Sequence, residues 1–184
     1  VDWTSVWLML SRFEEYYFGD NTAKHELTIT FRDYMEACKN ISDTQMYKKA
    51  EKYWKERIED LPPAPELPVV GKGGAEFKRF ELRLPKNDWL FFKSQALKTG
   101  VTPVAALVTA YGSVLERFST NKRFILNLTT LNRMPIDPQV KDLIGDFTSL
   151  SLITVDNRGD KTFSQRATDI NKTLFEVLDN HLYT

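Results

Sequence analysis

Polar side chains gather between two strand-like runs of this sequence. The runs 124–131 and 147–155 are rich in β-branched and aromatic residues, which suit a half-buried strand. Pro135, Pro138 and Gly145 punctuate their connection and argue against one long helix. The side chains that could do chemistry there are Asn132, Arg133, Asp137, Asp146, Thr148 and Ser149. Such groups at strand ends often build a site, although a plain strand connection is the alternative.

These residue types are suited to acid–base chemistry and to hydrogen bonding of a substrate. A carboxylate can move a proton, and a hydroxyl can orient or hydrogen-bond a reacting group. Arg133 could bind substrate, or it could pair with Asp137 or Asp146 to hold the loop. Asp146 is expected to fix the turn by accepting hydrogen bonds from nearby backbone N–H groups.

Composition limits the classes of protein to which the chain can belong. The 184 residues are 42% hydrophobic, enough to bury a core in one domain or two small lobes. Basic and acidic residues balance at 25 each, so no net field recruits nucleic acid or an anionic membrane. No apolar run is long enough to span a bilayer. Cys38 is the only cysteine, which excludes an internal disulfide, argues against a cysteine-based zinc site and fits the reducing cytoplasm.

The first third of the chain predicts helices. Residues 3–18 carry apolar side chains at spacings of three and four, with Asp2 or Thr4 as candidate N-cap. Residues 27–31 alternate as a short strand would, and 34–38 could form a helical turn. Residues 42–61 predict a second amphipathic helix with a capped start.

A stretch rich in proline and glycine, 62–76, then predicts a crossover. Beyond it the alternation of 77–84 predicts a strand, and helices follow from Pro85 to the Gly100 stop and over 103–118. The second of these is nearly all apolar and is expected to lie buried between layers. After the two strands around the polar connection, 162–182 predicts a last helix. The sequence therefore predicts an α/β two-layer fold.

Several short runs occur in a characteristic order along the chain. They are FRDY (31–34), LPPAPELP (61–68), TP (102–103) with AY (110–111) and VL (114–115), NLT (127–129) with NR (132–133), and GDFTSL (145–150). This order resembles the heterocyclization domains of nonribosomal peptide synthetases, a branch of the condensation-domain superfamily. Asp2 and Ser5 are similar to the end of that family's D-x-x-x-x-D-x-x-S signature, whose first Asp would precede Val1.

The resemblance implies an incomplete chloramphenicol-acetyltransferase-like fold, the condensation-domain fold. Residues 1–61 would end the N-terminal lobe, 62–76 would be the crossover, and 77–184 would form part of the C-terminal lobe. The chain also starts without Met, so it reads as a piece of a longer polypeptide. Because half a tunnel cannot enclose two tethered substrates, the piece alone is predicted to be inactive.

What the resemblance implies for function is condensation of a carrier-bound acyl donor with carrier-bound Cys, Ser or Thr. Cyclodehydration to a thiazoline or oxazoline would follow. The domain itself would need no cofactor, since phosphopantetheine is carried by the partner carrier proteins. The implied partners are upstream and downstream peptidyl carrier domains and an adjacent adenylation domain, with no nucleic acid and no membrane.

The resemblance also proposes roles for individual residues. Thr148 and Asp179 match positions associated with cyclodehydration, although Asn180 stands where the family commonly has His. Each has a plain alternative: Thr148 as a β-former and Asp179 as a solvated helix charge. Substrate-binding roles are predicted for Asn132, Arg133 and Ser149, structural roles for Asp2, Ser5 and Asp146, and no metal site is expected.

Two other functions compete with heterocyclization. An ordinary condensation domain would form only the amide, and it would carry H-H-x-x-x-D-G in place of the aspartate signature. Trp3 follows Asp2 where that motif has Gly, which favours heterocyclization. The third possibility is a noncatalytic lobe that docks carrier proteins.

Overall fold

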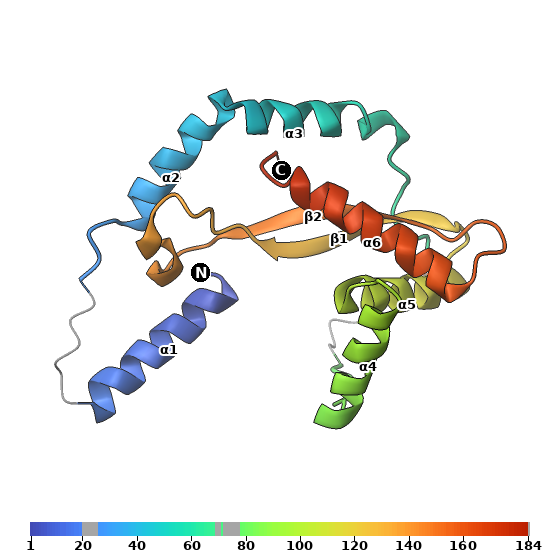
Figure 1. The fold of residues 1–184 in the computed structure, drawn as a ribbon, viewed down its shortest axis with the longest axis horizontal. Helices are drawn as coiled ribbons and strands as arrows, with labels where there is room; N and C mark the ends of the chain where they lie inside the picture. Colours follow the sequence, from blue (N-terminus) through green and yellow to red (C-terminus); the bar gives the residue numbers. More distant parts are fainter. Residues whose placement is uncertain (20–25, 69–70, 72–77, 184) are drawn as a thin grey trace. The chain divides into compact units, whose positions relative to one another are not determined.

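A computed structural model of the chain describes residues 1–19, 26–68, 71 and 78–183. The elements are α1 (Trp3–Phe18), α2 (Phe31–Lys39), η1 (Asn40–Asp43), α3 (Gln45–Lys55), η2 (Ile58–Asp60), α4 (Lys86–Lys98), α5 (Pro103–Phe118), β1 (Arg123–Leu131), η3 (Pro138–Asp142), β2 (Thr148–Asp156) and α6 (Phe163–Asp179), where η marks a 3-10 turn (Figure 1). Helices and paired strands are both present, as the predicted α/β class requires.

The chain divides into two compact units that differ from the predicted lobes. Unit 1 holds Val1–Glu56, Leu128–Ser151 and Asn180–Thr184, and unit 2 holds Arg57–Asn127 and Leu152–Asp179. Each of the two strands therefore contributes residues to both units. The division into lobes at 1–61 and 77–184 stays a prediction.

The two strands pair with each other and run antiparallel. The Asn132 N–H donates to the Phe147 carbonyl at 2.8 Å, and at the other end the Asn157 N–H donates to the Lys122 carbonyl at 3.0 Å. Residue numbers that rise on one strand while they fall on the other define antiparallel pairing. Both strands were predicted from their β-branched runs, and their bounds agree with the prediction within about one residue, the usual scatter of element ends.

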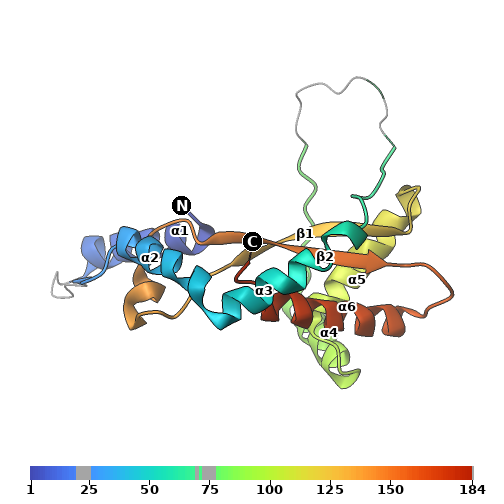
Figure 2. The same cartoon turned by 90° about the horizontal axis from the view of Figure 1, so that it is seen from above.

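Unit 2 is built around the contact between α5 and α6, with α4 packed on α5. Figure 2 shows α6 running beside β2. The core holds the buried side chains of Phe124, Ile153 and Val155. Gly112 lets α5 approach the strand closely, because a Cβ there would lie 3.0 Å from a Val155 methyl. Close packing against Val155 therefore explains the one glycine inside the helix predicted over 103–118.

Local capping explains where the helices begin. The Ala105 N–H donates to the Thr102 hydroxyl at 3.2 Å, and Pro103 occupies the first turn, as predicted. The Thr44 hydroxyl accepts from the Tyr47 N–H at 3.2 Å, so α3 starts later than residue 42 and ends before η2.

Two predicted strands are wrong. Residues 27–30 form no strand because Thr30 and Asp33 make a capping box, which starts α2 at Phe31. Residues 78–84 form no regular element, and Phe77 lies outside the described residues. Alternation alone does not make a strand without a partner edge, and Phe80 is 94% exposed here.

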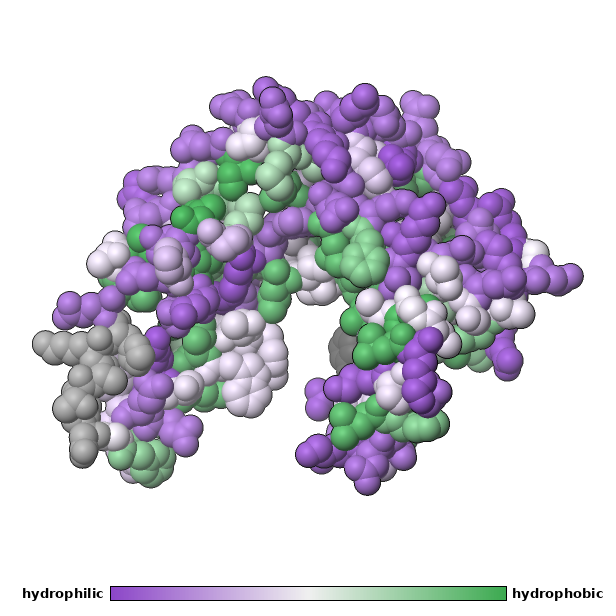
Figure 3. All heavy atoms as spheres, in the orientation of Figure 1, coloured by the Kyte–Doolittle hydropathy of each residue, from purple (hydrophilic) through white to green (hydrophobic). Residues whose placement is uncertain are grey.

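Helices α1, α4 and α5 carry apolar side chains that are exposed. The predicted burial of 103–118 holds for Ala105, Ala106, Thr109 and Gly112, but it is wrong for the opposite face of α5. That face exposes Val104, Leu107, Tyr111, Val114 and Phe118. In α1 the amphipathic face is likewise exposed, and Trp3 is 70% accessible. Figure 3 shows hydrophobic surface over α4 as well, where Phe91 is exposed.

Candidate functional site

A buried carboxylate at the start of α1 organises the candidate site in unit 1. Asp2 is only 4% exposed, and its Oδ1 accepts from the Ser5 N–H at 2.7 Å, which makes Asp2 the N-cap. Its other oxygen accepts from the Phe147 N–H at 3.3 Å. The structural role predicted for Asp2 therefore has a geometric basis that joins α1 to the polar connection.

The Ser5 hydroxyl is fully buried and joins the same two segments. It donates to the Gly145 carbonyl at 2.9 Å and accepts from the Gly145 N–H at 3.0 Å. The Gly145 carbonyl also accepts from the Asp2 N–H at 3.0 Å. The GDFTS segment is therefore fixed at its glycine by the two residues that resemble the aspartate signature.

Arg133 supplies the positive charge that a buried carboxylate needs. One guanidinium nitrogen lies 3.2 Å from Asp2 Oδ1 and 3.0 Å from Ser5 Oγ. The other donates to the carbonyls of Val140 and Leu143 at 3.0 and 2.8 Å. The partner of Arg133 is thus Asp2, which is 131 positions away, rather than the nearby Asp137 or Asp146 that the sequence suggested.

The guanidinium also stacks on an aromatic ring. Its central carbon lies 3.9 Å from the centroid of the Phe147 ring, a cation–π geometry. Since Phe147 directly precedes Thr148, Arg133 holds the segment through both charge and stacking. These contacts favour the alternative in which Arg133 holds the loop, and its substrate-binding role stays a prediction.

The electrostatics of the cluster favour an ionised Asp2. Burial by itself raises the pKa of the Asp2 carboxyl, because a charged group loses hydration. Hydrogen bonds from Ser5, the charge of Arg133 and the Phe147 N–H outweigh that cost and hold the pKa below its usual value. The cluster is a paired, hydrogen-bonded ion pair rather than a poised acid.

Thr148 is exposed at the first residue of β2, beside an ionised carboxylate. Its N–H donates to Asp146 Oδ1 at 3.0 Å, a contact of the kind expected if Asp146 fixes the turn. Hydrogen bonds from the Thr148 hydroxyl and N–H lower the pKa of Asp146. A solvent-accessible hydroxyl beside a carboxylate is an arrangement that can pass a proton.

Ser149 and Asn132, two of the predicted substrate-binding residues, differ in their hydrogen bonds. Within the described part of the chain, Ser149 Oγ is buried and has no hydrogen-bond partner. A buried hydroxyl without a partner is costly, and it keeps its full capacity to donate and accept hydrogen bonds. Asn132 is half-buried, and its backbone bonds to Phe147 and to the Tyr34 hydroxyl.

Asp179 lies in the other unit, as the last residue of α6, and its side chain is exposed. The next residue, Asn180, is buried, and its carbonyl accepts from the Trp54 indole N–H at 3.0 Å. Thr148 therefore belongs to unit 1 and Asp179 to unit 2.

Sequence reasoning missed the contact between two of the quoted motifs. A Cβ on Gly145 would lie 2.2 Å from the Phe31 ring, so only glycine fits where the GDFTS segment meets the FRDY run. Both runs stood out in the sequence, but neither contains a local signal that they touch.

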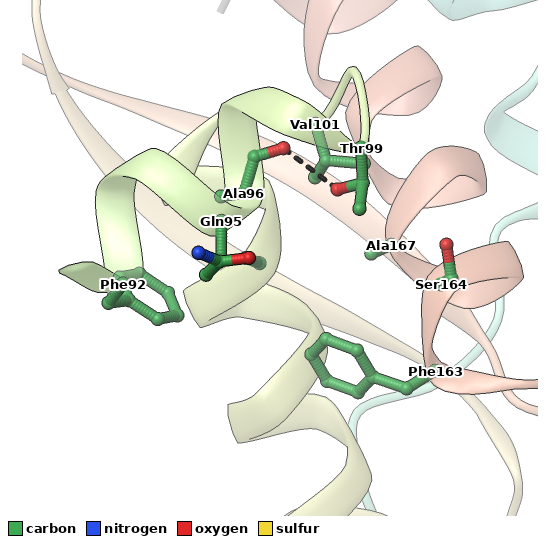
Figure 4. A pocket seen from close by; sticks show the side chains of 9 residues that line it. Phe92, Gln95, Ala96, Thr99, Val101, Phe163, Ser164 and Ala167 are labelled. Atoms are coloured by element: carbon green, nitrogen blue, oxygen red, sulfur yellow. Dashed lines mark hydrogen bonds between the residues drawn. The ribbon is translucent and has the colours of Figure 1, made fainter.

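Unit 2 contains a pocket that none of these residues lines. In unit 2 a cavity of about 270 Å³ is lined mainly by apolar side chains from α4, α5 and α6, with Phe92 and Phe163 on its walls (Figure 4). None of the predicted site residues belongs to this lining. Over the described residues there is no group of three His, Cys, Asp or Glu side chains that could hold a metal. None of the described helices is long and apolar enough to cross a membrane.

Comparison with known proteins gives the class of this fold and site. The family model of the condensation domain matches residues 1–183. The chain belongs to the condensation domain family. Its resemblance to that superfamily, read from the motifs, is therefore confirmed, and with it the condensation-domain fold.

Individual relatives refine this picture. The chain is 33% identical to bacitracin synthase 1 of Bacillus licheniformis over 99% of its length, and 37% identical over 77% to phenyloxazoline synthase MbtB of Mycolicibacterium paratuberculosis. A solved structure of the EpoB nonribosomal peptide synthetase cyclization-docking bidomain from Sorangium cellulosum superposes with a TM-score of 0.85 at 32% identity, over 98% of this chain and 37% of that one. The chain spans only 4% and 12% of the two synthases.

Proposed function

We propose that this chain is part of a heterocyclization domain of a nonribosomal peptide synthetase. Such a domain joins a carrier-bound acyl donor to carrier-bound Cys, Ser or Thr and then cyclodehydrates the amide to a thiazoline or oxazoline. The partners are upstream and downstream peptidyl carrier domains, whose phosphopantetheine arms hold the substrates, and an adjacent adenylation domain. Residues 1–61 and 77–184 are proposed as parts of the two lobes, joined by 62–76.

One observation carries the proposal. Asp2 and Ser5, which resemble the end of the aspartate signature, hydrogen-bond directly to Gly145 and Phe147 of the GDFTS segment. Two motifs quoted for the same family thus form one buried cluster. The similarity to a cyclization bidomain and to a phenyloxazoline synthase supports the same reading.

The proposed chemistry has simple requirements. The acceptor's thiol or hydroxyl adds to the carbonyl carbon of the new amide, and the carbonyl oxygen becomes a hydroxyl. That hydroxyl then leaves as water with the amide N–H proton. A base must help the attack and an acid must protonate the leaving hydroxyl. We assign proton transfer to Asp179 and orientation of the reacting group to Thr148, with Asn132 and Ser149 as substrate-binding groups.

An ordinary condensation domain is the second candidate. The choice of acceptor separates the two in the intact synthetase reconstituted with loaded carrier domains. We expect carrier-bound Cys, Ser or Thr to give a product lighter by one water than the simple amide, whereas carrier-bound Ala gives the amide alone. An amide that keeps its water with every acceptor would instead identify the ordinary condensation reaction.

A further inference from the structure

Tyr34 is the largest polar side chain in the core of unit 1. It is 4% exposed on α2 and belongs to a cluster with Val140, Leu143 and Phe147. Tyrosine is placed in a core only where its hydroxyl finds partners, because a buried polar group without them is costly. Its partners therefore show what the side chain holds.

The Tyr34 hydroxyl bridges the backbone on both sides of Arg133. It donates to the Asn132 carbonyl at 2.8 Å and accepts from the Met134 N–H at 3.2 Å. These are the residues that immediately precede and follow the arginine. The phenol oxygen therefore holds the backbone from which the Arg133 side chain extends.

The ring of Tyr34 reaches the other side of the same cluster. Its centroid lies 4.9 Å from that of Phe147 at an interplanar angle of 62°, an edge contact. Phe147 is the ring on which Arg133 stacks, and the next residue is Thr148. One side chain therefore supports both the arginine and the segment that the arginine holds.

Tyr34 is poorly suited to transfer a proton itself. Burial raises its pKa to about 12, so the hydroxyl stays protonated near neutral pH. Its proton is donated to a backbone carbonyl, and the residue as a whole is buried. A protonated, hydrogen-bonded hydroxyl of this kind fits a positioning role for Tyr34 better than a catalytic one.

We propose that Tyr34 is a positioning residue for ring closure. Its hydroxyl fixes residues 132–134, so that Arg133 and Phe147 hold Thr148 in the position that the reaction requires. The identity of the reaction rests on the proposed heterocyclization function. The geometric part, that the hydroxyl orders residues 145–149 through residues 132–134, rests on its hydrogen bonds and on the contacts of Tyr34 and Arg133 with the Phe147 ring.

The test is Tyr34→Phe in the intact synthetase, which keeps the ring and removes only the hydroxyl. Loss of this bridge is expected to slow ring closure about tenfold, while amide formation stays near the wild-type rate. The ratio of uncyclised amide to ring product therefore rises. Tyr47→Phe is the matched control, because the Tyr47 ring packs on Tyr183 at the edge of the same unit, away from Arg133 and Phe147.

Other outcomes overturn the proposal. An unchanged ratio shows that the hydroxyl does not position the site, and equal loss of both steps shows that it serves folding only. Hydrogen exchange of residues 145–149 in the same variant reports the geometric part separately, and protection there must fall. If the wild type forms amide without ring, the heterocyclization function fails, while exchange still decides whether Tyr34 orders the segment.

Discussion

Replacing Thr148 or Asp179 by Ala in the intact synthetase is expected to slow ring formation by a factor of about 10²–10⁴. That range is typical for removal of a group that transfers a proton or orients the reacting atoms. Uncyclised amide should accumulate, since amide formation does not require the same proton transfers. The product is identified by its mass, which is greater by one water than that of the ring.

Matched controls come from exposed residues of the same types. Thr168→Ala and Asp169→Ala both lie on α6, where Thr168 bonds its own helix and Asp169 pairs with Lys161 at the surface. Both controls should form the ring at the wild-type rate. Normal ring formation by Thr148→Ala or Asp179→Ala would remove the role assigned to that residue.

Arg133→Met is expected to lower the local stability of the segment around Gly145 and Phe147 by about 3–5 kcal/mol. The reason is that Asp2 would remain buried and charged without its partner, which costs more than the ion pair itself contributes. The measurement is hydrogen exchange of peptides covering residues 2–5 and 145–147 in the intact synthetase. Exchange there should become faster by a factor of about 100 or more.

The control for this charge removal is Arg158→Met. Arg158 pairs with Asp156 at 2.6 Å, but its side chain is 63% exposed, so solvent screens the pair and it contributes little to stability. Local exchange around residue 156 should barely change. Unaltered exchange at 145–147 in Arg133→Met would contradict the view that the Asp2 pair holds this loop.

Helices were predictable wherever a cap and a periodic apolar face coincided. Thr102 and Pro103 mark the start of α5, and the Gly100 stop ends α4 with a positive φ of 72° that suits glycine. The two central strands followed from their β-branched runs. Local signals were sufficient in these places because the determinants lie within a few residues of each other.

Strand predictions failed where the structure depended on residues outside the alternating run. The capping box of Thr30 and Asp33 overrode the alternation of 27–31. The run 78–84 has the pattern of a strand, but the described part of the chain contains only the pair β1 and β2 as a sheet. The nearly all-apolar sequence of α5 likewise predicted burial on every side, and it contains no signal that one face would be exposed.

The candidate site was predictable in its members and not in its geometry. Motif resemblance selected Asp2, Ser5, Arg133 and the GDFTS segment, but no local pattern pairs Asp2 with Arg133. The contacts of Tyr34 and Phe147 were missed for the same reason. The hydrogen-bond partners of Tyr34 lie about a hundred positions away in the sequence, and only the fold brings such residues together.

The most direct test of heterocyclization follows the oxygen atom that the reaction removes. The donor acyl group is loaded on its carrier domain with a heavy-oxygen label in the carbonyl and offered with carrier-bound Cys to the intact synthetase. If the acceptor thiol attacks that carbonyl and water departs, the amide intermediate carries the label and the ring product has lost it. A final product that retains the labelled carbonyl as an open amide would contradict the assignment.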